Sequence, residues 1–181
     1  MDETGAVPAS EHNTFIGTNA GGGDWITTVS DGNVGVGSHS MIAVMNAATF
    51  NTGVGYLSMT ALTEGDNNVA VGKSAGAAIS VGDDNVLIGK EAGTAIVDGH
   101  SNTCIGKDAG NTIVSGIRNI IIGHSADVDH EGRDDNICIG YGITTAGASD
   151  TLRIGGASNF LSYGFGSGGD VTISSDVRTK K

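Results

Sequence analysis

The chain has 181 residues, of which 31 are glycine, one is proline and only 4% are aromatic. Its formal net charge is −11 at pH 7, because nine Lys and Arg stand against twenty Asp and Glu, and the basic residues cluster only at the extreme C-terminus. This charge argues against nucleic acid and anionic membranes as partners, and no apolar run approaches the roughly 20 residues that a membrane-inserted helix needs.

Residues 1–12 contain the single proline, Pro8, and are expected to be a lead-in to a repetitive shaft, 13–155. In the shaft one phrase returns: Asn, two variable residues, Ile or Val, and Gly. Regular copies stand 17 residues apart, from Asn68-Val-Ala-Val-Gly72 to Asn136-Ile-Cys-Ile-Gly140; looser copies begin at Asn13, Asn33 and Asn51, and a degenerate one at Thr151. A fixed short period predicts stacked, nearly identical coils.

Each phrase is expected to form a short strand that enters a turn at its Gly. The second and fourth positions share one face of such a strand, and we expect that face to point into a core. The fourth position is occupied by Ile16, Val36, Val54, Val71, Ile88, Ile105, Ile122, Ile139 and Ile154. The opening Asn is a turn former, and stacking in register would let the Asn side chains form an amide ladder.

A second apolar position lies eleven residues after the Asn, and it predicts a second strand in each coil. It is occupied by Val44, Leu62, Ile79, Ile96 and Ile113. His130 breaks the series, and if it points inward its protonation should loosen the shaft in acid. Recurring Ala-Gly pairs, such as Ala75-Gly76, suit a tight corner.

A coil of 17 residues with three or four apolar side chains encloses a thin core, so we expect several chains to share one core. The sequence therefore predicts an all-β fold, a homotrimeric β-helix or β-roll built from 17-residue repeats. It leaves open whether each chain forms its own coils or three chains interleave.

The period ends after the shaft, and residues 156–174 are expected to form an aromatic, Gly-rich cap or tip that closes with a strand at Val171–Ser174. Aromatic residues in the irregular inserts and in this tip are the candidates for receptor contact. They are Trp25, Tyr56, Tyr141, Phe160, Tyr163 and Phe165.

The ending Ser175-Asp176-Val-Arg178-Thr-Lys180 resembles the opening of the intramolecular chaperone domain of phage endosialidases, tail fibres and neck appendages. The Asn-x-x-Ile-Gly repeats are similar to the trimeric β-helical shafts that precede that domain and, more distantly, to the head repeats of trimeric autotransporter adhesins. The resemblance implies a self-cleavage junction between Ser175 and Asp176. It also implies that residues 175–181 are the first residues of a trimer-assembling chaperone whose catalytic part lies outside this sequence.

Together these features predict a structural and receptor-binding segment of a phage tail fibre or similar virion appendage, which adheres to a cell-surface polysaccharide. The expected location is the outside of a virion, or alternatively a bacterial surface as a trimeric adhesin head. No enzymatic activity is expected, but the alternative is a polysaccharide-degrading fibre that uses Asp134 and Asp135 near Arg133, with Asp150 and Arg153 one coil away.

No cofactor or metal ion is expected. His124 and His130 lie near Asp127, Asp129 and Glu131, but the two histidines lack a usual metal-ligand spacing and are expected to be solvated turn residues. Cys104 and Cys138 occupy the third position of phrases two repeats apart. Two layers separate them by roughly 9–10 Å, beyond the reach of a disulfide, so free packed thiols are expected.

Overall fold

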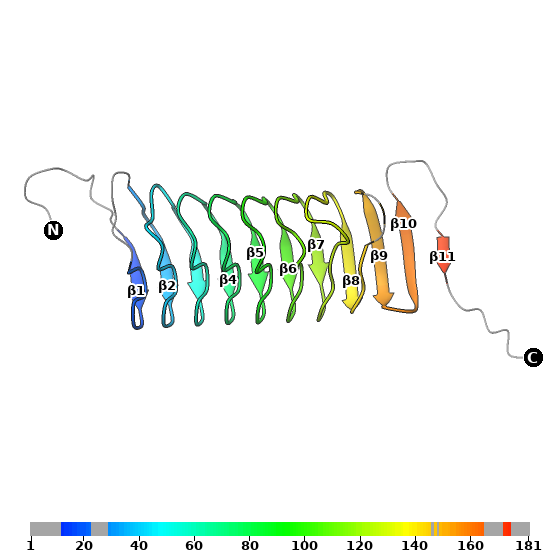
Figure 1. Cartoon of the computed structure of the whole chain (residues 1–181), viewed down its shortest axis with the longest axis horizontal. Helices are drawn as coiled ribbons and strands as arrows, with labels where there is room; N and C mark the ends of the chain where they lie inside the picture. Colours follow the sequence, from blue (N-terminus) through cyan, green and yellow to red (C-terminus); the bar gives the residue numbers. More distant parts are fainter. Residues whose placement is uncertain (1–11, 23–28, 146, 148, 165–171, 175–181) are drawn as a thin grey trace, which may run out of the picture.

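The computed structural model is a β-solenoid, and it describes residues 12–22, 29–145, 147, 149–164 and 172–174. All strands of these residues belong to one sheet in which each strand neighbours the next along the chain (Figure 1). They are β1 (Thr14–Ile16), β2 (Val34–Val36), β3 (Thr52–Val54), β4 (Val69–Val71), β5 (Val86–Ile88), β6 (Thr103–Ile105), β7 (Ile120–Ile122), β8 (Ile137–Tyr141), β9 (Thr151–Gly156), β10 (Phe160–Gly164) and β11 (Thr172–Ser174). The described residues contain no helix that could cross a membrane.

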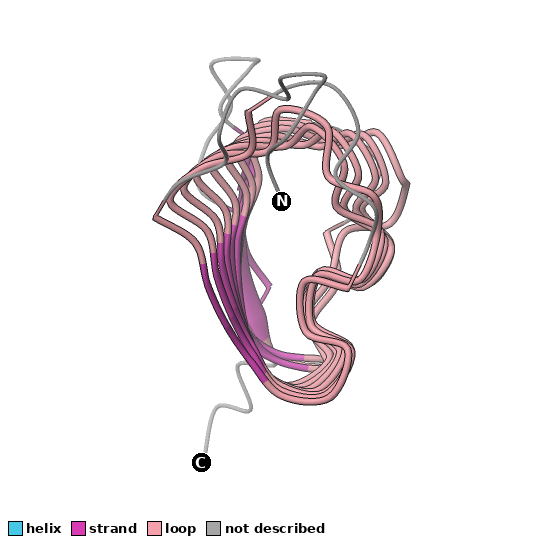
Figure 2. Cartoon of the chain, turned by 90° about the vertical axis from the view of Figure 1, so that its left-hand side faces the viewer, coloured by secondary structure: helices cyan, strands magenta, loops and turns pink. Residues whose placement is uncertain are grey.

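From β1 to β9 the strands run parallel and pair one repeat apart, as Val69 with Val86 and Val86 with Thr103. Each chain therefore forms its own coils, which decides between the two arrangements that the sequence left open. Seen along the stack, the coils superpose, with the strands on one side and loops closing the rest of the outline (Figure 2). The 17-residue period is the number of residues needed to return to the same point one layer on.

Each coil contains one strand, not the two that the sequence predicted. In the coil that begins at Asn68, Ser74, Gly76 and Asp84 have φ of 55°, 56° and 59°, so the chain turns sharply at three corners. Extended structure is interrupted by these corners. Backbone hydrogen bonds between coils persist there, as from the Gly76 amide to the Ala92 carbonyl at 2.9 Å.

The Gly that closes each phrase is required by two constraints. Gly106 has φ of 135°, which side-chain-bearing residues rarely adopt, and a Cβ atom there would lie 2.5 Å from the carbonyl oxygen of Gly123 in the next coil. The coils can therefore stack at strand spacing only where this position lacks a side chain.

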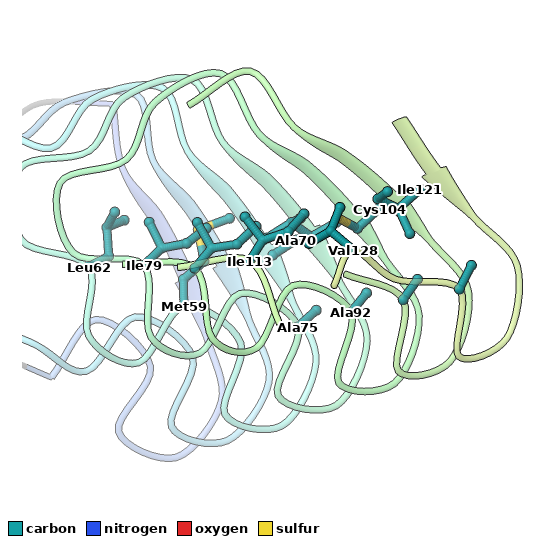
Figure 3. Packing of buried hydrophobic residues seen from close by; sticks show 14 of the residues in the cluster. Met59, Leu62, Ala70, Ala75, Ile79, Ala92, Cys104, Ile113, Ile121 and Val128 are labelled. Carbon is teal, nitrogen blue, oxygen red and sulfur yellow. The ribbon is translucent and has the colours of Figure 1, made fainter. Parts of the chain in front are cut away.

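The buried core lies inside the coil and is lined by the third position of each phrase (Figure 3). The fully buried side chains of this row include Ala70, Leu87, Cys104, Ile121 and Cys138. Alternation along the strand puts the third position inside the coil and the second and fourth outside, so the fourth-position residues expected in a core do not line the core of their own chain. Ile16, Ile88 and Ile154 are 61%, 39% and 42% exposed, and the remaining fourth-position residues are half-buried: Val36, Val54, Val71, Ile105, Ile122 and Ile139.

The row eleven residues after the Asn is buried at Leu62, Ile79, Ile96 and Ile113, which confirms that part of the prediction. Val44 is 36% exposed and Met45 is buried instead, because that coil is one residue longer than the regular repeat. His130 is exposed and Val128 is buried nearby. The premise for acid loosening, an inward-pointing His130, is therefore wrong.

Beyond the coils, β9, β10 and β11 pair antiparallel, so the first part of the expected cap continues the sheet. Phe160 is partly buried and packs against the buried core. The guanidinium carbon of Arg153 lies 3.7 Å from the centre of the Phe160 ring, a cation–π geometry.

Candidate functional site

The outer face of the parallel sheet is apolar and only partly covered by its own chain. It carries the second and fourth residues of each phrase, and from β2 to β7 these are all Val, Ile or Thr: Val34, Val36, Thr52, Val54, Val69, Val71, Val86, Ile88, Thr103, Ile105, Ile120 and Ile122. The in-register pairing places them in two continuous rows along the stack. We call this surface the outer face. Long exposed apolar surfaces of this kind mark interaction sites.

A ladder of buried Asn side chains holds the strands in this register. The Asn85 amide nitrogen donates to Asn68 Oδ1 at 3.0 Å and to the Gly99 carbonyl at 2.8 Å. The Asn85 Oδ1 atom accepts hydrogen bonds from the Asn102 backbone amide at 3.0 Å and from the Asn102 side-chain amide at 3.1 Å. Buried polar groups that are fully paired specify one arrangement of the chain, so the predicted amide ladder is confirmed and positions every strand of the outer face.

A second ladder runs just before the strands and uses carboxylates as acceptors. The Thr49 backbone amide donates to Asp66 at 2.6 Å, that of Asp66 to Asp83 at 2.7 Å, and that of Ile117 to Asp134 at 2.8 Å. These acidic residues therefore bind backbone amides of the preceding coil in addition to facing solvent.

The outer face is bordered by two rims, one at each end of the strands. The N-terminal rim consists of the residue immediately before each phrase: Phe50, Asn67, Asp84, Ser101, Arg118 and Asp135 in the coils from β3 to β8. The C-terminal rim consists of the residue immediately after the Gly of the same phrases: Tyr56, Lys73, Lys90, Lys107, His124 and Tyr141. Both rims can be found in the sequence by aligning the repeats at their 17-residue period, but only Tyr56 and Tyr141 of these residues were predicted to make receptor contacts.

Two receptor-contact candidates, Tyr56 and Tyr141, lie on the C-terminal rim and are 49% and 68% exposed. Tyr141 stacks on His124 with ring centres 5.3 Å apart, and Tyr56 meets His39 edge-on at 6.2 Å. Phe160 and Tyr163 are half-buried on β10, two strands beyond β8 in the sheet. The structure therefore brings two candidates to one row.

The remaining candidates lie outside the described residues. They are Trp25, Phe165 and the junction residues Ser175 and Asp176. Residues 1–11 of the expected lead-in are likewise outside.

Two of the carboxylates considered for glycan hydrolysis bind groups of the preceding coil. Asp134 accepts a hydrogen bond from the Ile117 backbone amide at 2.8 Å, and Asp135 accepts one from Arg118 at 2.6 Å. Arg133, which was expected near these carboxylates, donates instead to Asp129 at 2.7 Å. The hydrogen bond from Arg118 holds the pKa of Asp135 below the ordinary value. A general acid needs a raised pKa, and Asp135 does not have one.

Asp127 is the described carboxyl whose pKa is raised, and burial is the main cause. Its oxygens accept hydrogen bonds from the Thr112 backbone amide at 3.0 Å, the Thr112 hydroxyl at 2.9 Å and the Val128 amide at 2.8 Å. These bonds favour the charged form and offset part of the effect of burial. The carboxylate therefore anchors neighbouring backbone.

Among the described residues no three His, Cys, Asp or Glu side chains gather in a way that would hold a metal ion. Cys104 and Cys138 are buried and free, as predicted. Burial raises the pKa of both thiols, that of Cys138 to about 11. Since the thiolate is the reactive form, these cysteines are structural.

Comparisons of this chain with protein-family models, with curated protein sequences and with solved structures find no match.

Proposed function

We propose that this chain is a structural and receptor-contacting shaft segment of a trimeric fibre, in which three parallel copies pack their outer faces around a common axis. The observation that carries the proposal is the outer face itself. It is a straight strip of Val, Ile and Thr that the chain leaves half-exposed from β2 to β7. Covering such a strip removes apolar area from water and stabilises association by roughly 25 cal/mol per Å² before the costs of binding.

The fold supports a mechanical role. Every parallel strand hydrogen-bonds to its neighbours in register, and the buried Asn ladder runs through the same coils. A stack in which each coil contacts the coils before and after it extends in one direction without a bulky core. Such a segment serves as a spacer that carries attached parts away from a surface.

The resemblance to phage tail-fibre shafts gives the proposal its setting. We place the segment on the outside of a virion, with a bacterial cell surface as the other setting that the adhesin-like repeats suggest. The partner is a cell-surface polysaccharide or glycoconjugate. Three copies of each outward-facing loop would give avidity for a repetitive glycan even if each contact were weak.

The test is glycan-array binding by wild type and by the Ile122→Asp variant, which places a carboxylate on the outer face. The trimer is expected to bind a subset of surface glycans, and the variant should lose that signal because its copies no longer act together. Equal binding by the two proteins, or binding by neither, would contradict this function. Release of oligosaccharides from a bound polysaccharide would instead indicate the enzymatic alternative.

A further inference from the structure

The two rims that border the outer face complement each other in the coils of β3 and β5. Phe50 and Tyr56 flank the same strand, β3, and both are exposed, at 62% and 49%. Asp84 and Lys90 flank β5 and are both exposed. At the first of these levels both rims are aromatic, and at the second one rim is anionic and the other cationic.

The other four levels match less closely, since Lys107 lies opposite the neutral Ser101 and Tyr141 lies opposite Asp135. In the coil of β4, Asn67 and its neighbour Asp66 lie at the N-terminal rim, and Lys73 lies at the C-terminal rim. The N-terminal rim carries a cation at Arg118, and there the C-terminal rim has His124 in place of the preceding lysines. Every lysine among the described residues lies on the C-terminal rim, although the chain as a whole is strongly acidic.

The rims of one chain are too far apart to satisfy each other. Asp84 and Lys90 are six positions apart along near-extended chain, a span of roughly 20 Å. Within the chain Lys90 reaches Glu91 at 3.2 Å and Lys107 reaches Asp108, whereas Lys73 makes no ion pair with another described residue. A contact between the two rims therefore requires a second molecule.

Symmetry decides which arrangement brings the rims together. In a ring of parallel copies related by rotation about the fibre axis, contacts are head-to-tail, so the C-terminal rim of one copy meets the N-terminal rim of the next at the same height. In an antiparallel pair with its outer faces together, each rim would meet its own kind. That arrangement would place lysine against lysine and aspartate against aspartate.

We propose that the two rims are the seams of a parallel, head-to-tail ring of copies, with Lys90 of one copy paired with Asp84 of the next and Tyr56 packed against Phe50. The ion pairs set the direction and height of neighbouring copies, and the apolar outer face supplies most of the association energy. This inference rests on the proposed trimer, and it adds which side chains meet and in which polarity.

The first test is a charge swap measured as subunit exchange between fluorescently labelled trimers at about 50 mM salt, where exposed charges are weakly screened. Lys90→Glu should speed exchange by about tenfold, because three like-charged pairs form per trimer. Adding Asp84→Lys should return the rate to within about threefold of wild type. The matched control, Asp98→Lys, changes the charge of an exposed residue away from the rims and should leave the rate unaltered.

Exchange by Lys90→Glu within about threefold of wild type, or a double variant no slower than the single one, would overturn the seam. In either case the wild-type chain is still a trimer, so the proposed function stands. A wild-type chain that is monomeric would instead overturn the proposed function, so the two failures are distinguishable.

The second test uses a short bifunctional maleimide on the variant Phe50→Cys/Tyr56→Cys. The native thiols are buried and do not compete. A head-to-tail ring predicts covalent trimers from the double variant and only monomers from Phe50→Cys or Tyr56→Cys alone. Covalent dimers from either single variant, or no cross-linking of the double variant, would overturn the proposal.

Discussion

At the scale of single residues, the buried Asn of each phrase is the position where sequence and structure agree most directly. A turn-forming amide at a fixed 17-residue spacing has one way to pair when the coils stack, so the ladder was predictable. Its partners in the loops, such as the Gly99 carbonyl, were not, because the loop path between strands is set by left-handed corners that many residue types occupy here.

Asn85→Ala should destabilise the fold by about 1–3 kcal/mol for each buried group left unpaired. The Asn102 backbone amide and the Gly99 carbonyl both lose their partner. Urea unfolding measures the loss. Asn111→Ala, which removes one 3.4 Å contact to the Thr94 amide, is the control and should cost far less; equal losses for the two variants would count against the ladder.

Gly106→Ala should destabilise the fold by about 2–4 kcal/mol. A residue with a side chain is strained at the positive φ of this position, and its Cβ would clash with the Gly123 carbonyl. Thermal unfolding followed by circular dichroism checks this. Gly156→Ala adds a methyl group where no atom lies within 4 Å and should be nearly neutral. Similar melting temperatures for both variants would show that the coils are not stacked as closely as described.

Asp127 predicts a pH dependence of known sign. Its folded pKa is raised, so its contribution to stability is fully present below the ordinary value of 3.8 and is lost as the pH rises through the folded pKa. The free energy of unfolding of wild type minus that of Asp127→Asn should therefore fall between about pH 3 and pH 7. A difference that stays level or rises across this range would contradict the burial assigned to this carboxyl.

At the scale of the element, the short strand was predictable but its inner face was not. Both faces are apolar, and alternation alone does not say which one a coil encloses. The regular Ile and Val of the fourth position suggested a core, yet the inner row varies in size from Gly53 to Ile121. Inside the coil, neighbours compensate for that variation: a Cβ on Gly53 would lie 3.0 Å from the Met41 side chain.

Ile121 and Ile122 test this assignment because they are adjacent and differ only in the face they occupy. Ile121→Asp buries a charge inside the coil and should prevent folding. Ile122→Asp should leave the β-sheet circular dichroism spectrum intact and abolish association. A folded Ile121→Asp protein, or an unfolded Ile122→Asp protein, would show that the inner and outer faces of the strands are assigned the wrong way round.

At the scale of the whole molecule, each chain is a stack of coils, and three such stacks form the proposed assembly. One chain encloses a narrow core and leaves the long apolar outer face uncovered. The thinness of that core was readable from the repeat length and composition. Which face of the strands is left uncovered could not be predicted from the sequence.

Light scattering on the purified chain measures whether three copies associate. If the outer face is buried between three copies, the mass should be about 54 kDa, three times the 18.1 kDa of one chain. It should stay there on dilution to about 1 μM, as expected for an association stronger than about −8 kcal/mol. A folded protein of 18.1 kDa at every concentration would contradict the account.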